Sequence, residues 1–286
     1  MWDPNRRPHD LSDLWDVFKS RRPHNLGFER IFLGNSGYKS LAELVRENRT
    51  RGLSFRGMRI YSEEMKSEGI VSSEIVSCMD AIADNYIRSI KASSNSDEFT
   101  EILFGSFGKV DYPPKTLSDV PLLESIQISD TELRRLSTVR AIALAIMRCT
   151  NLKSLSFNRC SVPYDEKLDI LWGCIATTEA RISHLEMVNM PSFHSELEME
   201  FVIDAISKHP IQYIHLDVLM YEAFWIMLKN MKHLQEVYLK YYGGNIKYIR
   251  EKYVYNAFNG KELRVYRGPH PEQVKAGVSQ DYRDKQ

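Results

Sequence analysis

The sequence predicts an α/β fold, a curved solenoid with one parallel sheet on its concave side and helices on its convex side. Two observations predict it: an apolar pattern suited to a short strand recurs along the chain, and a helical pattern follows several copies of it. A strand–helix unit of this size cannot bury its apolar side alone, so the units must stack on one another. We therefore expect successive strands to lie side by side in one sheet.

The strand pattern is clearest in residues 211–218, IQYIHLDV, where apolar and polar residues alternate. This alternation would turn Ile214 and Leu216 toward a core and Tyr213, His215 and Asp217 toward the opposite face. The same spacing of apolar residues recurs, with its middle residue at positions 31, 53, 102, 126, 155, 185, 214, 237 and 263. Every interval but one is 22 to 30 residues, which is typical of strand–helix repeats.

Between the strands the apolar spacing changes to that of an amphipathic helix. Four helical faces are clear: Val139, Ile142, Ala143 and Ile146; Leu168, Leu171, Trp172 and Ile175; Phe201, Val202, Ala205 and Ile206; and Tyr221, Phe224, Trp225 and Leu228. The change of period predicts a strand, a turn and a helix, in that order, within each unit.

The one long interval runs for 49 residues, from position 53 to position 102. Residues 61–68 carry a short helical pattern, and a longer one begins after two candidate capping residues, Ser72 and Ser73. We predict a helical insertion around residues 61–92. A degenerate repeat in the same place is the alternative.

The solenoid is expected to span residues 28–268, with a different kind of segment at each end. Residues 1–27 are expected to form a capping helix flanked by basic turns, because a terminal repeat would otherwise expose the edge of its core. Leu11, Leu14, Trp15 and Phe18 share one face of this helix. The alternative is that this face makes a second contact with a partner. Residues 269–286 are polar and are expected to form a flexible tail.

Composition narrows the class of function. Lysine and arginine total 38 residues, and so do aspartate and glutamate, so no net field attracts nucleic acid or an anionic membrane. The four cysteines show no metal-ligand spacing, and the N-terminus lacks the apolar centre of a signal peptide. We expect an intracellular protein, cytoplasmic or nuclear, that uses no cofactor.

One segment, Leu152–Cys160, matches the pattern L-x-x-L-x-L-x-x-N/C in full and reads LKSLSFNRC. Together with the repeat spacing, it resembles the leucine-rich-repeat proteins, in the helical, ribonuclease-inhibitor-like branch found mostly inside cells. The resemblance implies a concave parallel sheet, convex helices and a role in protein binding. It also implies that the Cys160 side chain hydrogen-bonds the turn of the next repeat.

The outward residues of the strands are expected to line the concave surface. The predicted middle row is Ser54, Leu103, Gln127, Ser156, Glu186, His215, Tyr238 and Arg264. The last four strands present aromatic and charged residues, which are typical of protein interfaces. The predicted partner-binding site consists of His184, Glu186, Tyr213, His215, Asp217, Glu236, Tyr238, Lys240, Arg264 and Tyr266. Two lateral pairs, Glu186–His215 and Asp217–Lys240, are expected to hold this surface rigid.

Catalysis at this surface is disfavoured by geometry. In a relay of Ser156, His215 and Asp217, the serine and the histidine would lie two strands apart, roughly 9.6 Å at the usual strand spacing. Proton transfer between them needs ~2.6–3.2 Å or one intervening water. A metal ion held by Glu186, His215 and Asp217 would occupy a wide, wet site without a tight ligand motif.

The leading hypothesis is a non-enzymatic adaptor or scaffold that presents a preformed concave surface to a protein partner. One alternative is a substrate receptor similar to the F-box leucine-rich-repeat subunits of ubiquitin ligases, although residues 1–27 are too few for a three-helix F-box and lack a Leu-Pro start. The other alternative is a ligand-binding protein or an enzyme that uses Glu186, His215 and Asp217.

Overall fold

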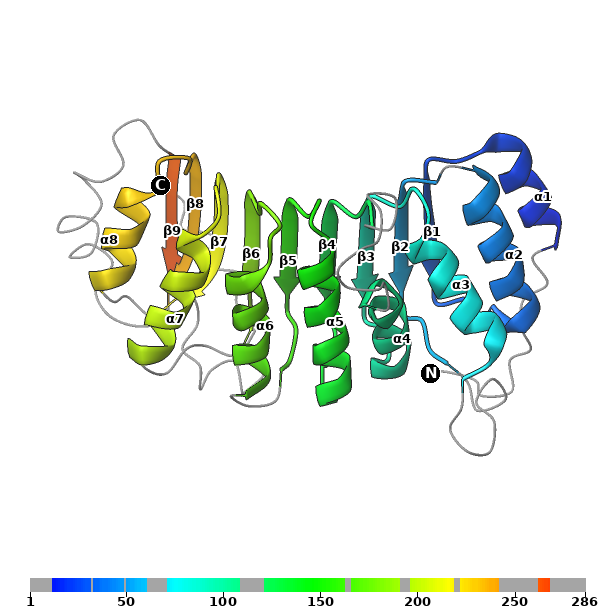
Figure 1. Ribbon diagram of the computed structural model, residues 1–286, viewed down its shortest axis with the longest axis horizontal. Helices are drawn as coiled ribbons and strands as arrows, with labels where there is room; N and C mark the ends of the chain where they lie inside the picture. The colour runs from blue at the N-terminus through cyan, green and yellow to red at the C-terminus, as the bar shows by residue number, and fades with distance from the viewer. Residues whose placement is uncertain are drawn as a thin grey trace.

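A computed structural model of the chain describes residues 12–31, 33–48, 50–60, 71–108, 121–162, 166–190, 196–218, 222–241 and 262–267. The described residues form one sheet of nine parallel strands, in which neighbours in the sheet are neighbours along the chain. The described helices all cover the same face of this sheet (Figure 1). The fold is therefore α/β with a single open parallel sheet, an arrangement compatible with a solenoid.

The strands are short and evenly distributed along the chain. They are β1 (Asn25–Glu29), β2 (Gly52–Arg56), β3 (Ser89–Ser93), β4 (Ser125–Ser129), β5 (Ser154–Asn158), β6 (His184–Val188), β7 (Tyr213–Val218), β8 (Glu236–Tyr241) and β9 (Glu262–Arg267). In Figure 1 they run side by side across the molecule behind the helices.

The helices form a second layer. They are α1 (Ser12–Arg21), α2 (Gly34–Asn48), α3 (Ser73–Ala83), α4 (Asp97–Gly108), α5 (Leu136–Arg148), α6 (Glu166–Thr177), α7 (Glu196–Ser207) and α8 (Glu222–Asn230). Each contacts the next along the chain, from α1 to α8. The four helices predicted from apolar faces are present as α5, α6, α7 and α8, but Phe201, predicted on the apolar face of α7, is exposed. Tyr221 and the side chain of Trp225 lie outside the described residues. None of the helices in the described part of the chain is long and apolar enough to cross a membrane.

Alternation along the strands separates the core from the open face of the sheet. In β4, Ile126 and Ile128 are fully buried under the helices, whereas Ser125, Gln127 and Ser129 remain partly exposed. The first, third and fifth residues of such a strand therefore line the face that the helices leave uncovered.

A residue in the left-handed backbone conformation follows each of the first six strands. These residues are Arg30, Gly57, Ser94, Asp130, Arg159 and Asn189, with φ between 51° and 66°. The N–H groups of the first five extend the ladder of the sheet: that of Asp130 donates to the Asn158 carbonyl at 2.9 Å, and that of Arg159 donates to the Val188 carbonyl at 2.9 Å. Six units thus bend at the same place, although five of them lack the glycine that adopts this conformation most readily.

The side chain after this bend ties neighbouring units together. Asn95, only 7% exposed, donates from Nδ2 to the Phe55 carbonyl at 3.1 Å and accepts from the Met58 N–H at 2.8 Å. Cys160 holds the same position in its own unit, and its Sγ donates to the Ile128 carbonyl at 3.4 Å. Both side chains hydrogen-bond the preceding strand. The resemblance implied that Cys160 would hydrogen-bond the turn of the next repeat, and this expectation is wrong, because the contact is with the preceding repeat.

The strand predicted near position 102 is wrong. That segment belongs to α4, where Phe99, Leu103 and Phe104 are fully buried, so Leu103 lies in the helix layer and not on the sheet. The strand of this unit is β3, whose inward residues are Ile90 and Ala92. The apolar pattern of β3 is weak because its second inward residue is the small Ala92. The apolar residues of α4 are closely spaced and therefore resemble the pattern of a strand.

Part of the range predicted as a helical insertion, residues 61–92, is regular structure. α3 lies between α2 and α4 in the helix layer, and Ser72 caps it, because its hydroxyl accepts from the Ile75 N–H at 3.5 Å. The next residues enter β3, a strand of the sheet. The described part of this range therefore favours the alternative, a degenerate repeat.

The N-terminal helix is confirmed as α1. The ring centroid of Trp15 lies 6.2 Å from that of Phe28 in β1 and 5.9 Å from that of Phe18. Trp15 is only 6% exposed. Trp15 would therefore have to leave the core to reach a partner. The strand predicted around position 31 is wrong: β1 is Asn25–Glu29, with Leu26 and Phe28 inward, so the sheet begins before the predicted start at position 28.

Several predictions for the chain ends lie outside the described residues. They concern the first basic turn, Leu11, the side chain of Leu14 and the tail 269–286.

Candidate interaction surface

The pairing register aligns the outward residues of all nine strands in rows across the open face. The middle row consists of Gly27, Ser54, Lys91, Gln127, Ser156, Glu186, His215, Tyr238 and Arg264. The observed row differs from the predicted row at two places: Lys91 of β3 replaces Leu103, and Gly27 of β1 is an additional member.

The outward residues change character along the sheet. β4 and β5 present serine, glutamine and asparagine, whereas β6, β7 and β8 present aromatic and acidic residues. We call the following six the aromatic–acidic cluster: His184, Glu186, Tyr213, His215, Glu236 and Tyr238. They are exposed or half-buried and come from the first and third positions of three adjacent strands. All six belong to the site predicted from the sequence.

Four rings form a continuous path across the cluster. The ring centroids of His184 and Tyr213 lie 5.8 Å apart with an interplanar angle of 19°. The centroid distance is 5.3 Å from Tyr213 to Tyr238 and 5.6 Å from Tyr238 to His215. These distances are in the range in which aromatic pairs attract one another. Each ring is therefore ordered by a ring on a neighbouring strand.

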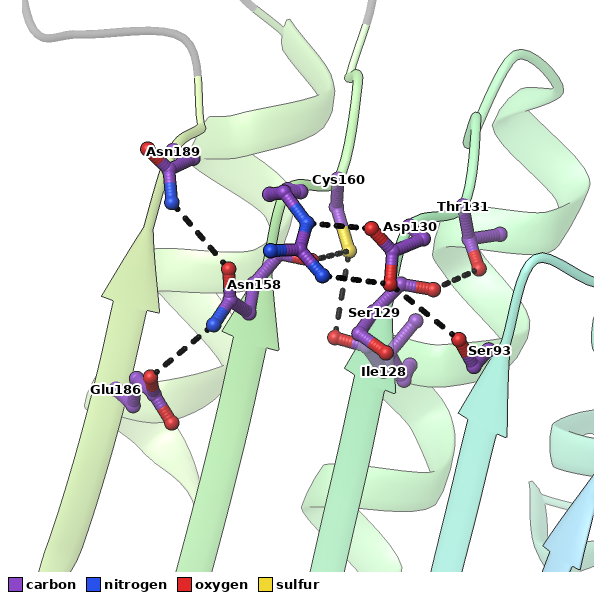
Figure 2. A network of polar contacts seen from close by, with 10 residues as sticks. Ser93, Ile128, Ser129, Asp130, Thr131, Asn158, Cys160, Glu186 and Asn189 are labelled. Atoms are coloured by element: carbon purple, nitrogen blue, oxygen red, sulfur yellow. Dashed lines mark hydrogen bonds and ion pairs between the residues drawn. The ribbon is translucent and has the colours of Figure 1, made fainter. Parts of the chain in front are cut away.

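Glu186 joins the cluster to β5. The Ser156 hydroxyl donates to Oε2 of Glu186 at 2.7 Å. Figure 2 shows the second contact, in which Nδ2 of Asn158 donates to Oε1 of Glu186 at 3.4 Å. Nδ1 of His215 lies 3.5 Å from the same Oε1. The predicted Glu186–His215 pair is therefore present, and the carboxylate is held from both sides.

The surroundings of Glu186 favour its ionised form. The hydrogen bond with His215 is the main cause that lowers the pKa of the Glu186 carboxyl from its ordinary value, and partial burial opposes it. The pKa of Tyr213 is raised to about 12, first by burial and then by the charge of Glu186, with a smaller effect of Glu236. The carboxylates of Glu186 and Glu236 thus both act on the Tyr213 hydroxyl, in addition to burial.

The other four residues of the predicted site lie at β7, β8 and β9. By backbone register Asp217 is the partner of Lys240, Lys240 is the partner of Tyr266, and Tyr238 is the partner of Arg264. The side chains of Asp217, Lys240, Arg264 and Tyr266 lie outside the described part of the chain. Their contacts, including the Asp217–Lys240 pair, stay predictions.

A polar network at the carboxyl ends of the central strands was not predicted (Figure 2). Nε and Nη2 of Arg159 donate to the two carboxylate oxygens of Asp130 at 2.5 and 3.0 Å, and this contact lowers the pKa of Asp130. Nδ2 of Asn189 donates to Oδ1 of Asn158, and Nδ2 of Asn158 in turn donates to Oε1 of Glu186. The only sequence signal is that polar residues follow the strands at one repeated position, where the left-handed bends lie.

The relay considered from the sequence is not assembled, because Ser156 does not lie beside His215; the serine next to a histidine of the cluster is Ser183, whose Oγ lies 3.0 Å from Nδ1 of His184. Glu186 on β6 stands in register between Ser156 on β5 and His215 on β7, and the Ser156 hydroxyl donates to the carboxylate. Burial raises the pKa of the Cys78 and Cys149 thiols to about 12, so both are protonated at neutral pH. Among the described side chains, no group of three His, Cys, Asp or Glu residues could hold a metal ion.

Compared with models of known protein families, the chain matches none, and no curated protein matches its sequence. Function is therefore inferred from the geometry of the surface alone.

Proposed function

We propose that the chain is a non-enzymatic interaction module of the leucine-rich-repeat type, an adaptor or scaffold that binds a protein partner on the open face of its sheet. The observation that carries this proposal is the aromatic–acidic cluster, six partly exposed side chains ordered on three adjacent strands. Side chains that are already ordered lose little conformational entropy on binding. Tyrosine is also enriched among the residues that dominate interface energies.

Two regularities support the proposed repeat type. The left-handed bend recurs after six consecutive strands, and the Asn95 and Cys160 side chains bind equivalent carbonyl groups of the preceding unit. Residues 87–95, IRSIKASSN, follow L-x-x-L-x-L-x-x-N, with isoleucine and alanine at the apolar positions. The four buried free cysteines suit a reducing compartment, the cytoplasm or the nucleus.

Replacement of Tyr213 and Tyr238 by alanine tests the proposed site. Removal of one tyrosine at the centre of an interface commonly costs ~2 kcal/mol, so the double variant should bind the partner at least ~30-fold more weakly. The measurement is affinity capture from a lysate of the protein's own cells with quantitative mass spectrometry, followed by titration of the captured partners.

The matched control is Tyr86→Ala, because Tyr86 is 55% exposed and lies in the turn before β3, away from the cluster. This variant should capture the same partners as the wild type. Thermal unfolding followed by circular dichroism establishes that all variants are folded. Equal capture by the wild type and the folded double variant would show that the proposed site is wrong.

A further inference from the structure

We propose that the aromatic–acidic cluster binds a basic segment of the partner, with an arginine or lysine side chain seated against the rings of Tyr213 and Tyr238. This assignment rests on the proposed function and adds the chemistry of the partner. It follows from three features of the open face: its carboxylates, its rings and the contrast between its two ends.

The carboxylates give the cluster a negative charge. Glu186 is held by Ser156, Asn158 and His215, and Glu236 accepts a hydrogen bond from the Tyr238 hydroxyl at 3.4 Å. By register the one lysine or arginine at an outward position of β5 to β8 is Lys240, the backbone partner of Asp217; none stands at the positions of the cluster itself. A cation supplied by a partner therefore complements this part of the sheet.

The rings offer a second attraction for the same cation. The faces of aromatic rings are negative, and a cation within about 6 Å of a ring centroid is attracted to it. Tyr213 and Tyr238 present two such rings 5.3 Å apart with an interplanar angle of 41°. Glu236 stands in register with Tyr213, so a cation over the rings also lies beside a carboxylate. Arginine suits this arrangement best, because its planar group stacks on rings and binds carboxylates through two N–H groups.

The opposite end of the open face has the opposite charge. Lys91 on β3 and Arg56 on β2 are exposed, and Arg51 and Arg88 are exposed just before these two strands. Two ion pairs offset part of this charge: Glu29 on β1 pairs with Arg56, and Glu124 pairs with Arg88 at 2.9 Å. The whole chain carries no net charge, so its total charge does not attract a basic segment. The local charges instead determine where such a segment binds: the basic side chains at β2 and β3 repel it, and the carboxylates at β6 to β8 attract it.

The experiment uses the full chain and four short fluorescein-labelled peptides. Each peptide has the same glycine–serine sequence with one residue type placed at the same repeated positions: arginine, lysine, glutamine or glutamate. Fluorescence anisotropy should show the arginine peptide bound most tightly, at least about tenfold more tightly than the glutamine peptide, with weaker binding at high salt. Glu236→Gln, and Tyr213→Leu with Tyr238→Leu, should each weaken the arginine peptide about threefold to tenfold.

Matched variants separate the cluster from general charge. Lys91→Gln, on the same face but at β3, and Tyr86→Leu should each change binding by less than about twofold. Arg264→Gln should tighten it, because this change removes the chain's own cation in register with Tyr238. The proposal is overturned if the arginine and lysine peptides bind no better than the glutamine peptide, if the glutamate peptide binds best, or if the cluster variants bind like the wild type.

Failure of this proposal is distinguishable from failure of the proposed function. Loss of partner capture in the Tyr213→Ala and Tyr238→Ala double variant, without any preference for arginine or lysine peptides, contradicts the basic segment and supports the interaction site. A clear arginine preference that the cluster variants abolish, together with unchanged partner capture, supports the cation site and contradicts the proposed function.

Discussion

At the scale of single residues, Asn95 shows how one buried side chain holds a unit in place. It satisfies two backbone groups of the preceding unit, the Phe55 carbonyl and the Met58 N–H. A buried backbone group without a partner costs ~1–3 kcal/mol, so the turn depends on this amide. Cys160 occupies the same position with a weaker donor, and burial raises the pKa of its thiol to about 12.

Replacement of Asn95 by alanine should lower the free energy of unfolding by ~2–3 kcal/mol, because it leaves two buried backbone groups unsatisfied. Urea unfolding measures the loss. Asn230, exposed at the end of α8, provides the control, and its replacement by alanine should change stability by less than ~0.5 kcal/mol. Similar losses in the two variants would contradict the role assigned to Asn95.

Glu186 allows a prediction about pH. Its folded-state pKa is lowered, so its ionisation contributes stability that is present above the ordinary carboxyl pKa of 4.5 and is lost as pH falls through the folded value. Glu186→Gln should therefore reduce the free energy of unfolding at neutral pH by ~1 kcal/mol. The difference from the wild type should shrink as the pH falls below the ordinary value.

Urea unfolding over a series of pH values measures this difference. Glu47→Gln, an exposed change in α2, is the control and should show almost no difference at any pH. A loss in Glu186→Gln that stays constant from neutral to acid pH would contradict the assignment.

At the scale of elements, prediction succeeds where the apolar pattern is strong and local. Helices α5 to α8 and strands β4 to β8 follow from periodicity, since their inward residues are large and apolar. It fails at β1, which lies before the strand predicted around position 31, and at β3 and α4. Ala92 is recognisable as an inward residue only by register, because it pairs with Phe55 on one side and Ile128 on the other.

A proline in β3 tests this assignment. Lys91→Pro should destabilise the protein by roughly 3 kcal/mol or more or prevent folding, because it removes a backbone donor from a central strand. Ser73→Pro is the control: Ser73 is exposed at the first position of α3 and follows the extended Ser72, where proline is well tolerated. Circular dichroism and urea unfolding compare them, and equal tolerance of both changes would contradict a strand at residues 89–93.

At the scale of the whole molecule, each unit contacts its neighbours along the chain, because the strand order in the sheet is the order in sequence. Stability in such a stack is a sum of local terms. The N-terminal end depends on α1, whose Trp15 is buried against Phe28.

Trp15→Ala should therefore loosen the N-terminal units most. Loss of a buried tryptophan costs ~3–5 kcal/mol, and amide hydrogen exchange should speed up in β1 and β2 far more than in β6 and β7. Val17→Ala, at a residue of the same helix that is 49% exposed, should leave exchange unchanged. Uniform acceleration across all strands would show instead that the molecule unfolds as one unit.

By itself, the sequence determined the alternation of strand and helix from β4 to β8 and which residues of β6 to β8 face outward, because apolar periodicity is a local property of the chain. Only the tertiary structure decided the place of β3, the role of Asn95 and the partners of Glu186. Ser156 and Glu186 are 30 residues apart in sequence. Such a contact depends on the register of two strands, which no local pattern contains.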